Sequence, residues 1–233
     1  MSERTWHAYE RWAASYDTDP NPQIVLEEEA VLREVDCQPG TAVLDAGCGT
    51  GRYSGRFQAL GGEVVGLDFS PAMLARARAR YPSLSLVLGD LGQTLPFRSR
   101  CFDRVNCAQT LKHLASLGSP MQEFARVLKP GGRLVFSVTH PAMTWEGYEM
   151  RETPEFILST EADIHHHALA DYVAAIENAS LSLEQVDSLP VDERIAALLT
   201  PQSFEAVRGR TQIAVFRARK SGAGEGGPES RDG

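Results

Sequence analysis

The feature that most constrains the fold is a glycine-rich loop, residues 47–51 (GCGTG), between an apolar run and a helical pattern. The run at 42–44 is apolar without alternation, which is typical of a central parallel strand covered on both faces. The loop glycines allow positive φ and let a ligand approach bare backbone. Residues 52–60 have a helical pattern, and the free N–H groups at a helix start favour an anionic ligand group. The stretch predicts a strand–loop–helix unit of an α/β sheet with a ligand at the loop.

A second apolar run, 63–67, ends at Asp68 and predicts the neighbouring strand. An acid at the tip of that strand can accept hydrogen bonds from both hydroxyls of a ribose. The loop reads G-x-G-x-G after Asp45, and so it differs from the G-x-G-x-x-G fingerprint of dinucleotide sites. The two elements together predict a nucleoside site, with the loop over the group that extends from the ribose.

Three motifs in order make the chain similar to a known family. VLDAGCGTG at 43–51, VGLDFSPAML at 65–74 and LKPGG at 128–132 resemble the class I methyltransferases that use S-adenosylmethionine. This resemblance implies a Rossmann-like α/β fold with a seven-stranded, mostly parallel sheet, an antiparallel C-terminal hairpin and helices on both faces. Residues 181–187 and 211–218 are the candidate hairpin strands.

The resemblance also implies S-adenosyl-L-methionine as the cofactor and assigns its contacts. Asp68 would hold the ribose, and Asp90 would face the exocyclic amine of adenine, with Leu91 as an apolar ring contact; the alternative for Asp90 is a plain turn residue. Gln109 follows the fourth strand, whose carboxyl end should reach the cleft. The expected cofactor-binding residues are Tyr16, Asp45, Gly47, Cys48, Gly49, Gly51, Asp68, Phe69, Met73, Asp90, Leu91 and Gln109.

The N-terminal segment, residues 3–17, predicts an amphipathic helix with aromatic residues near one face. In the family that it resembles, a Y-x-x-W-A-x-x-Y-D segment lies across the cofactor as a lid. Tyr9 and Tyr16 are then candidates to contact cofactor or acceptor, and the alternative is that they only pack the helix onto the domain. We therefore expect a lid at 1–20.

Residues 21–220 are expected to form the methyltransferase domain, with a cap inserted at about 141–165. The cap is rich in aromatic residues and acids, and it is where we expect acceptor specificity to reside. The last segment, 221–233, consists of Gly, Ser, Pro and charged residues and predicts a disordered tail. The expected substrate-binding residues are Tyr9, Trp145, His165 and His167.

Histidines are the candidate general bases, because their ordinary pKa lies near neutrality. A base is required only when the accepting atom is protonated, and then it contributes about 10²–10⁴-fold. The candidate catalytic residues are His140, at the end of the fifth strand, His113, beside Lys112, and His166. The alternatives are a helix-terminus residue for His113 and a polar surface turn for the triple at 165–167. Three adjacent histidines make a poor metal site, so no metal is expected.

Composition narrows the partners of this 233-residue chain, which is long enough to bury a sizeable core. A net charge of -8 and a pI near 5.3 argue against a nucleic-acid partner. The four cysteines include no C-x-x-C pair, and no apolar run has the length of a signal core or membrane span. We expect a cytoplasmic monomer or homodimer with reduced thiols and no membrane attachment.

These features predict an enzyme that transfers a methyl group to O, N or C of a small, partly apolar metabolite. Two alternatives stay open at this point. One is an RNA or protein methyltransferase, and the other is a non-methylating relative that binds S-adenosylmethionine and acts as a cyclase or isomerase.

Overall fold

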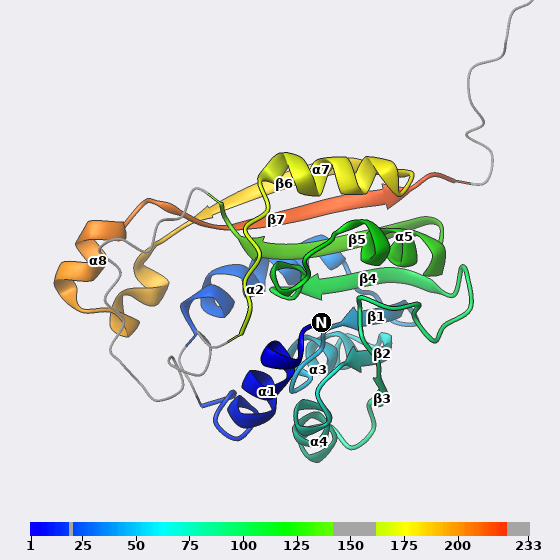
Figure 1. Cartoon of the computed structure of the whole chain (residues 1–233), viewed down its shortest axis with the longest axis horizontal. Coiled ribbons are helices and arrows are strands. Elements are labelled where there is room, and N and C mark those ends of the chain that lie inside the picture. Colours follow the sequence, from blue (N-terminus) through cyan, green and yellow to red (C-terminus); the bar gives the residue numbers. More distant parts are fainter. Residues whose placement is uncertain (19–20, 142–161, 223–233) are drawn as a thin grey trace, which may run out of the picture.

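The computed structural model describes residues 1–18, 21–141 and 162–222. A seven-stranded sheet in the order β3-β2-β1-β4-β5-β7-β6 forms its centre (Figure 1). The first five strands in sequence run parallel, and β7 pairs antiparallel with both β5 and β6. The strands are β1 Ala42–Ala46, β2 Glu63–Asp68, β3 Ser85–Leu88, β4 Phe102–Ala108, β5 Leu128–Thr139, β6 Leu181–Pro190 and β7 Thr211–Lys220. The predicted fold class is confirmed, including the C-terminal hairpin.

Three of the helices begin with the same local signal, a capping side chain followed by proline. The oxygens of Asn21, Ser70 and Thr200 each accept from a backbone N–H in the first turn, and proline at the next position has its φ already set for a helix. The helices are α1 Glu3–Trp12, α2 Pro22–Val35, α3 Arg52–Ala59, α4 Pro71–Arg80, α5 Gly118–Val127, α7 Leu169–Asn178 and α8 Pro201–Val207, with short 3-10 helices η1 Leu111–His113 and η2 Glu193–Leu198.

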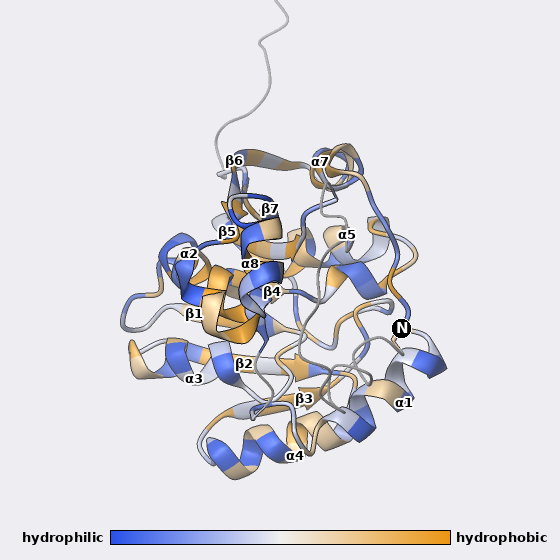
Figure 2. Cartoon of the chain, turned by 90° about the vertical axis from the view of Figure 1, so that its left-hand side faces the viewer, coloured by the Kyte–Doolittle hydropathy of each residue, from blue (hydrophilic) through white to orange (hydrophobic). Residues whose placement is uncertain are grey.

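The hydrophobic core lies in two layers, one on each face of the sheet (Figure 2). Helices α5 and α7 cover one face, and α2, α3 and α8 cover the other. Neighbouring residues of β1 divide between the layers, since Leu44 packs with α5 and Val43 packs with α2. In the first layer Phe136 stacks on Phe216 at 4.6 Å between ring centroids. Burial of each such side chain stabilises the fold by roughly 1.5–3 kcal/mol, and it explains why the strand at 42–44 is apolar on both sides.

Several element boundaries differ from the sequence prediction. The helix expected at 3–17 is shorter, and the hairpin strands expected at 181–187 and 211–218 extend to 190 and 220. Helix α1 ends at Trp12, and turns follow it, with the Tyr16 N–H bonded to the Trp12 carbonyl at 2.9 Å. Helix α7 begins at Leu169, after the histidine triple, because the Asp171 carboxylate accepts the Ala168 N–H at 2.7 Å and closes the first turn there. Most of the expected cap and nearly all of the expected tail lie outside the described residues.

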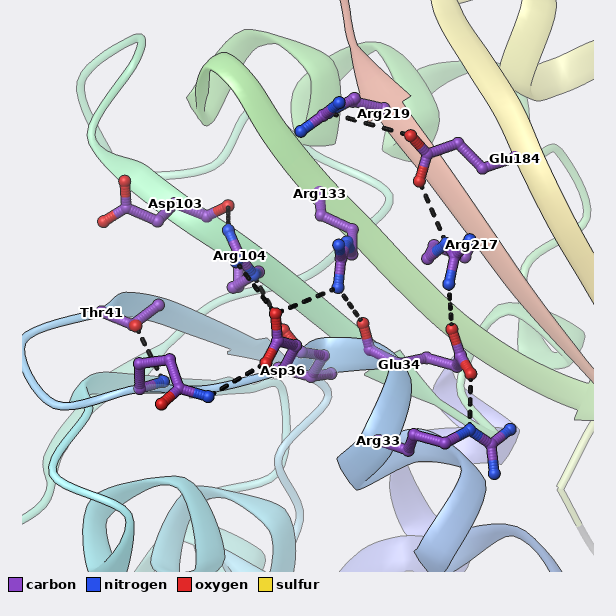
Figure 3. A network of polar contacts seen from close by, with 12 residues as sticks. Arg33, Glu34, Asp36, Thr41, Asp103, Arg104, Arg133, Glu184, Arg217 and Arg219 are labelled. Atoms are coloured by element: carbon purple, nitrogen blue, oxygen red, sulfur yellow. Dashed lines mark hydrogen bonds and ion pairs between the residues drawn. The ribbon is translucent and has the colours of Figure 1, made fainter.

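A network of ion pairs ties the C-terminus of α2 to the sheet toward the amino ends of β4 and β5 (Figure 3). Arg104 and Arg133 lie side by side in register, and both approach Asp36, which ends α2 in the left-handed conformation. Glu34 is buried and bonds to Arg217 of β7 at 2.5 Å. Because these groups lie at the edge opposite the glycine loop, they are part of the scaffold and not of the ligand site.

Candidate functional site

The glycine loop is held against the end of β2 by its own backbone. The N–H groups of Gly47 and Cys48 both donate to the Leu67 carbonyl, at 2.7 and 3.0 Å. The Gly49 N–H donates to Oδ2 of Asp68 at 2.8 Å. The loop and the acid that the sequence predicts to form one site are therefore in direct contact.

The three loop glycines are required for different reasons. A Cβ at Gly47 would lie 2.3 Å from Oγ1 of Thr110, so this position admits no side chain. Gly49 has a φ of +53° and nothing within 4 Å of the position of a Cβ, so its backbone is open to a ligand. At Gly51, with φ +79°, a Cβ would lie 3.3 Å from the side chains of Ala77, Tyr81 and Leu84. Only at Gly49 does the loop present open space.

Asp45 lies at the end of β1 but faces the interior. Its carboxylate accepts from the hydroxyl of Ser54 at 2.6 Å and from the amide of Asn106 at 2.8 Å. The residue is 2% exposed, and burial raises the pKa of the carboxyl. Asp45 thus joins β1 to α3 and β4, with both oxygens bonded within the protein.

Asp68 is the acid nearest to the open part of the loop. Its second oxygen, Oδ1, accepts the Ser70 N–H at 2.9 Å, while Oδ2 accepts from Gly49. Burial is the main cause that raises the pKa of Asp68 to about 6, and the backbone N–H groups counteract it. A carboxylate has about four lone-pair directions, so the two backbone bonds leave acceptor capacity for a ligand hydroxyl.

A cavity of about 330 Å³ lies beyond the carboxyl ends of β2 and β3. Its walls include Trp6, Phe69, Leu88, Gly89 and Asp90, together with the first three residues. Asp90 accepts from the Met1 nitrogen at 2.6 Å and from the Gly92 N–H at 2.8 Å. The cavity therefore combines aromatic and aliphatic walls with a carboxylate.

Two of the expected cofactor contacts lie in the core instead of in this cavity. Leu91 is 2% exposed and packs in the layer with α5, and Met73 has no exposed surface. The apolar ring contact that the sequence assigns to Leu91 is available from Leu88, an exposed side chain on the cavity wall. The sequence pattern does not show which of the two leucines is exposed, because Leu88 and Leu91 belong to the same strand-to-turn segment.

Helix α1 and the turn after it make polar contacts with three parts of the site, which are η1, the start of α4 and the glycine loop. The Tyr9 hydroxyl lies 2.9 Å from Nε2 of His113. Glu10 accepts from the Ser70 hydroxyl at 2.5 Å and from the Ala72 N–H at 3.0 Å, at the start of α4. Asp17 accepts from the Thr50 hydroxyl, within the glycine loop, at 2.7 Å. The aromatic ring of Tyr9 also lies edge-on to Phe69, at 6.0 Å between centroids.

A second polar cluster lies at the carboxyl ends of β4 and β5. The Lys112 ammonium donates to side-chain oxygens of Gln23 and Gln109, each at 3.1 Å. The Gln109 amide donates to Glu27 at 2.7 Å, and the Tyr53 hydroxyl donates to the same carboxylate at 3.1 Å. Glu27 is fully buried, and burial raises its pKa, while these hydrogen bonds lower it.

Sequence reasoning missed Gln23 and Glu27, although a signal was present. Positions 23, 27, 30, 31 and 34 fall on one face of α2 at helical spacing. All five positions are buried, and Ala30 and Val31 pack in the core, so a glutamate on this face indicates a paired interior carboxylate. The run of three acids at 27–29 concealed this signal, because it resembles an ordinary solvated segment.

The candidate histidines occupy very different surroundings. His113 is buried, with Nδ1 2.7 Å from the Asp163 carbonyl and Nε2 at the Tyr9 hydroxyl, so both ring nitrogens are bonded. A carbonyl only accepts, which assigns the proton to Nδ1 and leaves Nε2 to accept from Tyr9. Burial, with the nearby Lys112 cation, lowers the pKa of His113 to about 3. It is a neutral residue that anchors α1.

His140 follows the last residue of β5 and is half-buried, and burial lowers its pKa. Exposure alternates along the extended segment that carries the histidine triple, where His165 and His167 are half-buried and His166 is exposed. Nε2 of His167 bonds to the Leu114 carbonyl at 2.8 Å. The structure thus turns His166 away from the other two. Trp145 lies outside the described residues.

Across residues 1–18, 21–141 and 162–222, no group of three or more His, Cys, Asp or Glu side chains could hold a metal ion. None of the described helices is long and apolar enough to cross a bilayer.

Comparison with known proteins places this chain in a family. The profile of a family described as "Methyltransferase domain" matches residues 44–136. The demethylmenaquinone methyltransferase of Streptomyces griseus is 34% identical over 223 residues, which cover 90% of this chain and 91% of the relative. The chain belongs to the class I S-adenosylmethionine-dependent methyltransferases. A second demethylmenaquinone methyltransferase, from Beutenbergia cavernae, is 32% identical over 200 residues and covers 84% of this chain and 80% of its own length.

Solved structures agree with this methyltransferase assignment. An S-adenosylmethionine-dependent methyltransferase from Mesorhizobium loti superposes with a TM-score of 0.68 at 25% identity, covering 84% of this chain and 98% of that one. The residues present also fit the cofactor of the family. The open backbone at Gly49, the carboxylate of Asp68 and the cavity that ends at Asp90 follow one another along the carboxyl edge of the sheet.

Proposed function

We propose that this methyltransferase transfers a methyl group to an O, N or C atom of a small, partly apolar metabolite. The observation that carries the proposal is the similarity, over about nine tenths of both chains, to an enzyme named for demethylmenaquinone. That molecule is small and apolar, and the aromatic residues of α1, with Tyr9 against Trp12 and Phe69, suit an acceptor of this kind.

The cofactor half of the proposed site consists of the glycine loop and the cavity. The open backbone at Gly49 would lie against the methionine end of the cofactor. Asp68 would accept hydrogen bonds from the ribose hydroxyls, and Asp90 would accept one from the adenine amine. Phe69 and Leu88 supply the apolar walls for the ring. Asp45 and Met73 support the loop and α4 from the interior, and do not contact ligand in this proposal.

Residues 1–20 act as the proposed lid on the domain at 21–220. Their contacts with His113, Ser70 and Thr50 reach η1, the start of α4 and the glycine loop. A closed lid would therefore hold these three parts of the proposed cofactor site together. When bound, S-adenosylmethionine supplies a methyl group already activated on a sulfonium. The protein therefore has to position the acceptor and exclude water, and positioning alone contributes on the order of 7–11 kcal/mol.

His140 is the proposed general base if the accepting atom is protonated. It lies at the carboxyl end of β5, beside the cluster of Thr139 and Gln109, and its lowered pKa keeps the imidazole neutral at pH 7. His113 is a positioning residue in this proposal, because both of its nitrogens are bonded and its pKa is about 3. His166, as an exposed side chain, has no proposed role in chemistry.

The test is release of S-adenosylhomocysteine from S-adenosylmethionine by the purified protein. The acceptors are demethylmenaquinone, oxidised or chemically reduced, and a bacterial extract divided into metabolite and macromolecular fractions. We expect release with the metabolite fraction and a product heavier by one methylene. Release with only the macromolecular fraction would contradict the proposal and favour RNA or protein. Cofactor binding without release from any acceptor would favour the non-methylating alternative.

A further inference from the structure

We propose that Lys112 is the anion-binding residue of the acceptor site, so that the acceptor of this enzyme carries an ionised oxygen such as a carboxylate or phenolate. The inference rests on the proposed small-molecule function and specifies the chemical class of the substrate. It would make Lys112 a specificity-determining residue, in contact with the acceptor and not with the cofactor.

The ammonium group is held in place by two amide side chains from different elements. Gln23 of α2 and Gln109 after β4 each present Oε1 to Nζ at 3.1 Å. Both amides are themselves fixed, since Nε2 of Gln23 donates to Thr139 at 2.7 Å and Nε2 of Gln109 donates to Glu27 at 2.7 Å. The lysine is therefore preorganised before any ligand arrives, which lowers the entropy cost of binding.

The charge of Lys112 is only indirectly balanced within the protein. Its hydrogen-bond partners among the described residues are two neutral amide oxygens, whereas an ammonium has three N–H donors. The carboxylate of Glu27 is fully buried behind Gln109 and bonds to that amide and to Tyr53. A ligand oxygen of negative charge would satisfy the ammonium directly and offset its partial burial.

The backbone beside the lysine is strained, which is common at ligand sites. Gln109 has a φ of 53°, a left-handed conformation that is unfavourable for a residue other than glycine. Its N–H donates to the Ser137 carbonyl at 2.9 Å and holds that conformation. The strained position is the one that presents the amide to both Lys112 and Glu27.

The position of Lys112 suits an acceptor next to the cofactor loop. Thr110, two residues earlier, packs directly against Gly47. His113, the next residue, bonds to Tyr9 of the lid. Thr139, which receives the Gln23 amide, directly precedes His140. An anionic acceptor on Lys112 would thus lie between the glycine loop, the lid and the proposed base.

The first experiment uses 2-naphthoate and the neutral 2-naphthamide as matched apolar probes. Each is titrated by calorimetry at pH 7 into protein saturated with S-adenosylhomocysteine. We expect the wild type to bind the acid about 10- to 100-fold more tightly than the amide, the range that a charge-assisted hydrogen bond supplies. Lys112→Gln should abolish this preference. The control Lys129→Gln removes the same charge from an ion pair with Asp103 at the far edge, and should retain the preference.

The second readout is the pH dependence of naphthoate binding. Burial lowers the pKa of Lys112 to about 8, so acid binding by the wild type should decline as pH rises from 7 to 9. Glu27, His113, His140 and His165 are titratable side chains on neighbouring elements, together with Tyr9, Tyr53 and Asp163. Lys112→Arg keeps a cation at position 112 throughout this pH range, so its naphthoate binding should not decline. A decline caused by any of the neighbouring groups would persist in this variant.

Three results overturn the inference: equal binding of acid and amide by the wild type, a preference retained in Lys112→Gln, or the same decline in Lys112→Arg. Each leaves the proposed function intact, because binding of S-adenosylhomocysteine is measured first in the same samples. Failure of the wild type to bind S-adenosylhomocysteine would overturn the inference and the proposed function together.

Discussion

Gly47 and Thr110 pack so closely that a Cβ on the glycine would lie 2.3 Å from the threonine hydroxyl oxygen. The contact joins the loop after β1 to the segment after β4, and so it fixes the two strand ends that border the site. Gly49, two residues away, has open space at the same position. The two glycines therefore offer a matched pair of substitutions.

Gly47→Ala is expected to destabilise the protein by about 2–4 kcal/mol, the sum of overpacking and a left-handed alanine. Gly49→Ala is expected to cost only about 1 kcal/mol, because it carries the backbone cost alone. Urea denaturation followed by circular dichroism measures both. Equal losses for the two variants would contradict the packing argument.

Asp68→Ala should weaken S-adenosylhomocysteine binding by about 10- to 100-fold, because a charged acceptor of hydrogen bonds is lost. Calorimetry measures the affinity, and the circular dichroism spectrum should stay unchanged. Glu63→Ala, at the exposed opposite end of β2, is the matched control and should bind normally. Unchanged affinity in Asp68→Ala would remove the residue from the ribose site.

Asp68 should also produce a pH-dependent difference in stability between the wild type and Asp68→Asn. The pKa of Asp68 is raised from 3.8 to about 6 in the folded protein, so the folded state favours the protonated carboxyl. The contribution of Asp68 to the free energy of unfolding is therefore greatest below pH 4 and is lost as pH rises through 6. Between pH 4 and 7 the free energy of unfolding of the wild type should fall, relative to Asp68→Asn, by up to about 3 kcal/mol. A difference that does not vary with pH would contradict the raised pKa.

Tyr9→Phe should loosen the lid while leaving the domain folded. The change leaves Nε2 of His113 buried without its donor, at a cost of about 1–3 kcal/mol. Hydrogen exchange of the amides in α1 should accelerate, with little change in β1 or β4. Tyr81→Phe, in a residue whose ring packs against Gly55 of α3, is the matched tyrosine control. Unchanged exchange in α1 would mean that this bond does not hold the lid.

His140→Ala should lower kcat by about 10²–10⁴-fold for an acceptor that loses a proton, with little change in cofactor affinity. His166→Ala, at an exposed residue of the same type, should be close to wild type. Because burial lowers the pKa of His140, the rate should rise with pH through a value below 6.5 and then level off. Full turnover by His140→Ala would exclude it as the base.

Much of the proposed cofactor site was predictable from the sequence, because it depends on interactions between residues that are close together in the chain. The loop at 47–51 needs glycine for its backbone, Ser70 and Pro71 begin a helix by local bonds, and Asp68 ends a strand next to the loop. The acceptor side was less predictable. Its polar cluster joins Gln23, Gln109 and Lys112, residues up to 89 positions apart. The helical spacing within α2 can indicate a buried polar residue there, but no spacing in the sequence shows that these three residues meet.

The sequence by itself determined the order of strands and helices, the glycine loop and the family, because periodicity, capping and backbone sterics act over a few residues. Only the tertiary structure decided which way each polar side chain faces. It turned Asp45 and His113 into buried, fully bonded residues and left Lys112 with two neutral partners among the described residues. The physical reason is that burial and hydrogen bonding set the protonation state of a side chain and decide whether it can contact a ligand. Burial and hydrogen bonding both depend on residues that are distant in the sequence and are brought together by the sheet.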